Sequence, residues 1–193
     1  VGFLNHGEKW TITTTTTTTP SSPLGGLTIQ ATKGALVGPP WQTRENGYIL
    51  RSRQQSRSRS QSQSTTASSE EGKGSSSPSI YIEPHVEFDP KELQRVGPVD
   101  VVISPIEGQQ IASVFDLVFG PSKTIQLVEL LSPKVIIPMF NGNVEASGPV
   151  SNVVSTNGSE QEFRQRLDEI PSKQTTGTRI ENLIPGKDRR IRL

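Results

Sequence analysis

Short apolar runs along the chain predict a sheet with both antiparallel and parallel strands. Leu27–Thr32 alternates apolar and polar side chains as a half-buried strand does, and Gly47–Arg51 and Ser79–Glu83 have the same pattern. We expect the last two to form a hairpin. Pro98–Ser104 and Lys134–Pro138 are instead nearly continuous β-branched runs, which are typical of strands buried on both faces.

Two helices are predicted, one between the buried strands and one after them. Pro121–Leu131 has proline in its first turn and apolar residues at helical spacing. A second helix begins at Ser159, which forms an S-x-x-E capping box with Glu162, and its apolar face consists of Phe163, Leu167 and Ile170. A strand, a helix and a strand in this order form a βαβ unit, so the two buried strands are predicted to be parallel neighbours.

Two stretches contain almost no apolar side chains that could be buried. Thr13–Thr19 is a threonine homopolymer, and Ser52–Ser79 is rich in Ser, Gln and Arg. Neither offsets its ordering entropy, so both are predicted to be disordered, the second as an insert at the tip of the hairpin. The organisation that follows is a strand remnant with the Thr-rich segment over residues 1–26, a partial domain over 27–170 containing the insert, and a polar tail over 171–193.

Composition narrows the class of protein. The 193 residues carry a net charge of +1 and no cysteine, and no apolar run approaches the ~20 residues of a membrane span, so we expect neither nucleic-acid nor membrane binding. Only 31% of the residues are hydrophobic. A core that small indicates that a missing segment or a partner is needed for stability. The chain opens with Val1 and no targeting segment, which favours a processed or partial sequence.

Several stretches resemble the second half of the metallo-β-lactamase fold. They are Val99–Ile106, Gly120–Thr124 and Pro133–Met139, while Gly34–Tyr48 together with Tyr81–His85 resembles a subgroup from plants, algae and bacteria. The resemblance implies an α/β chain forming the C-terminal half of an αββα sandwich, with the N-terminal half missing. It also implies a metal-dependent hydrolase acting on a small molecule, and a chloroplast location where the cytoplasm would otherwise be expected.

The candidate metal ligands are Glu83 and His85. Residues two apart in a strand point to one face, so the two side chains could share a metal; the alternative is a histidine hydrogen-bonded at a strand end. The family's H-x-H-x-D-H motif is not in this chain, whose other histidine is His6 in a polar turn, and Phe140 stands where the resemblance places another histidine. Zinc needs three or four ligands. We therefore expect zinc or another divalent metal in the full-length protein and none in this chain alone.

A Pro-flanked loop containing Trp41, Arg44, Glu45 and Asn46 is predicted to line a pocket, with Trp41 covering the sheet as the alternative. No catalytic residue is assigned. The functional hypothesis is an incomplete or catalytically degenerate member of the hydrolase family. The alternatives are a non-catalytic binding or scaffold protein and a regulatory, RNA-linked protein acting through the alternating Ser/Arg residues of the insert.

Overall fold

The computed structural model describes residues 4–13, 26–36, 41, 43–53, 77–112, 115–140, 153–171 and 177–193. Most of the two segments predicted to be disordered, residues 14–19 and 54–76, lies outside the described residues. The ends of the predicted insert are corrected, because the strand before it extends to Arg53 and Ser79 begins the next strand. Thr13 likewise belongs to a strand.

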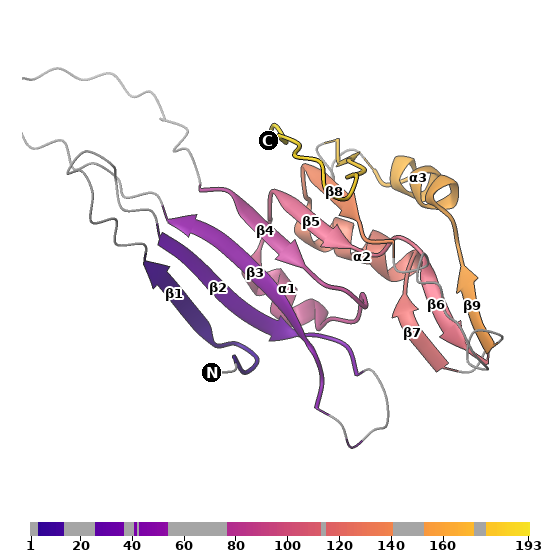
Figure 1. Ribbon diagram of the computed structural model, residues 1–193, viewed down its shortest axis with the longest axis horizontal. Helices are drawn as coiled ribbons and strands as arrows, with labels where there is room; N and C mark the ends of the chain where they lie inside the picture. Colours follow the sequence, from indigo (N-terminus) through magenta and orange to yellow (C-terminus); the bar gives the residue numbers. More distant parts are fainter. Residues whose placement is uncertain are drawn as a thin grey trace, which may run out of the picture.

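The main sheet has seven strands in the order β1-β2-β3-β4-β5-β8-β10 (Figure 1). Strands β1 to β4 are antiparallel neighbours, and β4, β5, β8 and β10 run parallel to one another. The predicted β3–β4 hairpin and the predicted parallel pair β5 and β8 are therefore confirmed. The strands are β1 (Lys9–Thr13), β2 (Gly26–Lys33), β3 (Asn46–Arg53), β4 (Ser79–Ile82), β5 (Val101–Ser104), β8 (Val135–Pro138) and β10 (Arg179–Ile180).

Three helices accompany the sheet in the described part of the chain, and two of them are those predicted. Helix α2 (Ser122–Leu131) begins just after Pro121, and α3 (Glu160–Asp168) begins where the Ser159 hydroxyl accepts the Glu162 N–H. Helix α1 (Pro90–Val96) was not predicted. The sequence nonetheless contains the signal for its start, because Asp89 is an N-cap residue and proline follows it in the first turn. The Asp89 carboxylate accepts the N–H groups of Lys91 and Glu92.

A second, three-stranded sheet in the order β7-β6-β9 was also missed. Its strands are β6 (Gly108–Ile111), β7 (Phe115–Phe119) and β9 (Val154–Asn157). The pair β6 and β7 stands between β5 and α2 in the chain, so the predicted βαβ unit contains an inserted hairpin (Figure 1).

The core lies mainly on one face of the main sheet. Inward side chains of β3, β4, β5 and β8 pack there with the apolar faces of α1 and α2; this cluster includes Ile49, Tyr81, Leu93, Val102, Leu127, Val128, Leu131 and Ile136. On the opposite face a smaller cluster joins Val101, Val135 and Ile137 to Ile191 near the C-terminus. None of the helices in the described part is long and apolar enough to cross a membrane.

Candidate functional site

The candidate metal ligands lie at the edge of the sheet where the parallel strands end. Glu83 directly follows β4, Pro105 follows β5 and Met139 follows β8. Because β3 runs antiparallel to β4, its first residue, Asn46, lies at the same edge. Open sheets with parallel strands bind their ligands beyond the carboxyl ends of those strands. We call this region the carboxyl edge.

Glu83 is buried at the carboxyl edge, with 1% of its surface exposed. Its backbone continues the sheet, since the N–H donates to the Ile103 carbonyl at 3.1 Å and the carbonyl accepts the Ser104 hydroxyl at 3.0 Å. Its side chain folds back on its own loop, where Oε1 accepts the His85 N–H at 3.0 Å. The other oxygen, Oε2, has no hydrogen-bond partner among the described residues.

Burial raises the pKa of Glu83 from its ordinary value of 4.5 to about 7, and the Glu45 carboxylate adds to the effect. The backbone N–H groups of His85, Val86 and Glu87 act in the opposite direction because they favour the ionised carboxylate. Val86 has a positive φ of 59°, which is rare for a β-branched residue and turns the chain tightly around the carboxylate. Near neutral pH this buried acid is therefore divided between its protonated and ionised forms.

Two glycines make room for a buried polar cluster around Oε2. A Cβ added to Gly47 would stand 2.8 Å from Oε2 and 2.7 Å from both the Thr32 hydroxyl and the Tyr81 hydroxyl, and one added to Gly34 would stand 3.0 Å from Oε2. Thr32 and Tyr81 are fully buried, with their hydroxyls 3.4 Å apart. Burial raises the pKa of the Tyr81 phenol, which stays protonated. This cluster was not predicted, although Glu83 follows Tyr81 by two residues at the end of β4, and both side chains lie beside Gly47.

His85 does not share that face, so the expectation that its side chain and that of Glu83 point to one side of a strand is wrong. The strand ends at Ile82, and the chain turns at Pro84. The His85 ring reaches the small sheet, where Nδ1 lies 3.0 Å from the Leu117 carbonyl oxygen, and Nε2 lies 3.1 Å from a Glu45 carboxylate oxygen. Its backbone carbonyl accepts the Phe119 N–H at 3.0 Å.

Three of the four residues of the predicted pocket loop have separate contacts. Arg44 binds the Glu87 carboxylate at 2.8 Å and the Gly34 carbonyl at 3.2 Å, Glu45 contacts His85, and the Asn46 amide donates to the Leu4 carbonyl at 2.8 Å. Burial acts to raise the pKa of Glu87, but the Arg44 hydrogen bond and the Leu36 N–H hold it below its ordinary value. Trp41 is 83% exposed and does not cover the sheet. That the loop lines a pocket stays a prediction.

The described side chains do not fit the metal that the fold family implies. Within the described part of the chain, no three His, Cys, Asp or Glu side chains converge on a position that could hold an ion. Phe140, two residues after β8, is 46% exposed and offers no lone pair. Catalytic zinc needs three protein ligands, and the described residues do not supply such a set.

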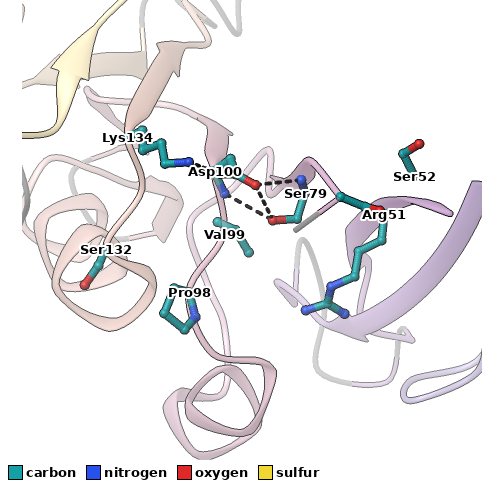
Figure 2. A pocket seen from close by; sticks show the side chains of 9 residues that line it. Arg51, Ser52, Ser79, Pro98, Val99, Asp100, Ser132 and Lys134 are labelled. Atoms are coloured by element: carbon teal, nitrogen blue, oxygen red, sulfur yellow. Dashed lines mark hydrogen bonds and ion pairs between the residues drawn. The ribbon is translucent and has the colours of Figure 1, made fainter. Parts of the chain in front are cut away.

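A pocket of about 630 Å³ opens at the opposite edge, where the parallel strands begin (Figure 2). Asp100 stands at its centre and accepts the N–H and the hydroxyl of Ser79 at 2.9 and 3.0 Å and the Lys134 ammonium at 2.7 Å. Arg51, on the β3 side, donates to the Val96 carbonyl at the end of α1. These bonds join the starts of β4, β5 and β8 and the end of α1. The charged side chains of the pocket therefore have a structural role.

The mixed main sheet, the small second sheet and three helices define an α+β layered protein, with helices on one face of the main sheet. Residues 74–140, from β4 to just after β8, match the family model described as the beta-lactamase superfamily domain. This match, which covers about a third of the chain, bears out the predicted resemblance to the metallo-β-lactamase fold, and the α+β architecture is consistent with the predicted fold class. No curated protein and no solved structure matches the chain significantly.

Proposed function

We propose that the chain is a catalytically degenerate module of the metallo-β-lactamase-fold superfamily, whose carboxyl edge is held together by hydrogen bonds instead of a metal. The observation that carries the proposal is the engagement of His85 on both ring nitrogens. A carbonyl oxygen only accepts, so Nδ1 carries a hydrogen toward Leu117. Nε2, the nitrogen left for a metal, faces the Glu45 carboxylate.

Glu83 supports the same proposal. Its Oε1 accepts the N–H of its own loop, and its Oε2 lies within a cluster closed by Gly34 and Gly47. An ion bound by both Glu83 and His85 would have to displace a contact of the His85 ring, which lies between the Leu117 carbonyl and the Glu45 carboxylate. The two side chains therefore position the loop between β4 and α1, which contacts the small sheet through His85.

Zinc titration followed by calorimetry and by elemental analysis after dialysis tests the proposal, together with phosphodiesterase, lactonase and thioesterase assays. We expect no stoichiometric zinc and no turnover. His85→Ala should lower stability, whereas His6→Ala is the matched control, because His6 is an exposed histidine in the turn before β1. Stoichiometric zinc with turnover that His85→Ala abolishes and His6→Ala preserves would overturn the proposal.

The proposal extends to the subgroup and its location. Gly34–Tyr48 and Tyr81–His85 supply the residues that resemble the plant, algal and bacterial subgroup, and Asn46 and Glu83 among them lie at the carboxyl edge. We place the protein with that subgroup and in the chloroplast. Immunolocalisation in the source organism checks this, and staining confined to the cytoplasm would contradict it.

A further inference from the structure

The pocket at the edge where the parallel strands begin is lined mainly by side chains that donate hydrogen bonds. We call it the amino-edge pocket; its volume of about 630 Å³ is within the ~300–1,000 Å³ that is usual for small-molecule sites. Its lining residues are Arg51, Ser52, Ser77, Ser79, Pro98, Val99, Asp100, Ser132 and Lys134. Every polar side chain of this set except Asp100 can donate. Such a lining favours a ligand with several acceptor oxygens.

Asp100 does not make the pocket acidic, because its charge and its acceptor positions are engaged within the protein. Oδ2 accepts the N–H and the hydroxyl of Ser79 at 2.9 and 3.0 Å, and Oδ1 accepts the Lys134 ammonium at 2.7 Å. Lys134 balances the charge of this carboxylate. The ammonium has three N–H groups and uses one of them in this bond.

Arg51 brings a positive charge that no carboxylate of the described residues balances by an ion pair. It is half-buried near the end of β3, and Nη2 donates to the Val96 carbonyl oxygen at 3.2 Å. That partner is neutral, and the bond uses one of the five N–H groups of the guanidinium. Charged groups held partly away from water are normally paired, so an arginine in this setting points to an anionic ligand.

The two cations lie on opposite sides of the pocket, with Asp100 and Ser79 between them (Figure 2). With one carboxylate and two cations, the lining side chains have a net charge of +1. Pro98 and Val99 add an apolar part to the wall. The amino-edge pocket therefore combines positive charge, hydroxyl donors and a small apolar surface.

We propose that the amino-edge pocket binds the phosphate group of a small phosphate monoester, with Arg51 as the principal contact. The planar guanidinium fork matches two phosphate oxygens, and such charge-assisted bonds are about twice as strong as neutral ones. The Ser52 hydroxyl and the Lys134 ammonium would supply further donors to the remaining oxygens. Pro98 and Val99 would contact the carbon portion of the monoester. This edge is opposite to the one that carries Glu83 and His85, so the inference does not depend on the proposed function.

Isothermal titration calorimetry of the full chain tests the proposal with two probes, inorganic phosphate and glycerol 3-phosphate, in chloride buffer at constant ionic strength. We expect one site, with the monoester bound at least as tightly as the free anion. Arg51→Gln should weaken both by roughly tenfold or more. Arg95→Gln is the matched control, because Arg95 is an exposed arginine of α1 outside the pocket lining, and its loss should change affinity by less than about twofold.

Nuclear magnetic resonance of the wild-type protein adds a readout that needs no variant. Glycerol 3-phosphate should shift the amide signals of Ser52, Ser79 and Val99 most, and circular dichroism establishes that each variant is folded. Arg51→Lys keeps the charge without the fork and should bind with intermediate affinity. The proposal is wrong if glycerol 3-phosphate does not bind, if free phosphate alone binds, or if Arg95→Gln weakens binding as much as Arg51→Gln. Shifts concentrated away from the pocket would also overturn it.

Discussion

The buried acid at the carboxyl edge makes stability depend on pH in an unusual direction. The folded pKa of Glu83, about 7, is above the unfolded value of 4.5, so the folded state retains a proton that the unfolded chain loses. Its contribution to stability is therefore fully present below about pH 4.5 and is lost as pH rises through 7. Carboxylates paired in the folded state have the opposite dependence.

The size of the effect follows from the shift. About 2.5 pKa units at 1.36 kcal/mol each correspond to about 3 kcal/mol, most of which should be lost between about pH 5 and 8. Solvent screening reduces this little, because only 1% of Glu83 is exposed. Glu83→Gln keeps the shape of the side chain and removes the titration, so its free energy of unfolding should lack this fall.

Urea unfolding of both proteins across that pH range isolates the effect, because other titrating groups cancel in the difference. We expect the wild-type protein to lose about 3 kcal/mol relative to Glu83→Gln as pH rises. A difference that stayed constant within about 0.5 kcal/mol, or that rose with pH, would refute the reasoning, because it would mean that the carboxylate is solvated or paired.

Four further predictions are tested by urea unfolding. Gly47→Ala should cost about 2–3 kcal/mol, because its Cβ would stand 2.7 Å from the Tyr81 hydroxyl, and Tyr81→Phe should recover part of that loss; a neutral Gly47→Ala would contradict the cluster. Asp100→Ala should cost about 2–3 kcal/mol by removing the carboxylate that accepts the Ser79 N–H and hydroxyl and the Lys134 ammonium, and an effect below about 0.5 kcal/mol would show that this network is dispensable. Ile136→Asp should prevent folding, since it buries an unpaired charge under α2; wild-type stability would refute the topology. Ser159→Ala should cost about 1 kcal/mol and Ser159→Asp little, and equal losses would exclude capping.

Periodicity was sufficient to predict most of the main sheet and two of the helices. The β-branched runs of β5 and β8 are strong signals because strands buried on both faces tolerate little else, and Ser159 marks a helix start by a hydrogen bond that is local in sequence. Helix α1 is only seven residues long and has one fully buried residue, Leu93, so it shows little apolar periodicity. Its prediction required attention to the Asp89 cap instead.

The candidate site was predictable in its residues but not in its geometry. The i, i+2 spacing of Glu83 and His85 implies one shared face only while the strand continues, and the strand ends at Ile82. The direction of His85 depends on β7, which is more than thirty residues further along the chain. The cluster brings together Thr32 from β2, Tyr81 from β4 and Glu83 just after β4 through the absence of a Cβ at Gly47, and no local pattern encodes that convergence.

His85 connects the main sheet to the small sheet, and this affects how its conservation among relatives should be interpreted. Its ring and its backbone carbonyl both bind β7, through Leu117 and Phe119, while β4 leads into it from the main sheet. A lineage that lost metal chemistry would still be selected to keep the imidazole, because its removal leaves the Leu117 carbonyl without its donor. Conservation of this histidine among relatives would therefore reflect selection for folding. Whether a relative has kept metal binding has to be judged at positions that have no such structural role, such as Phe140.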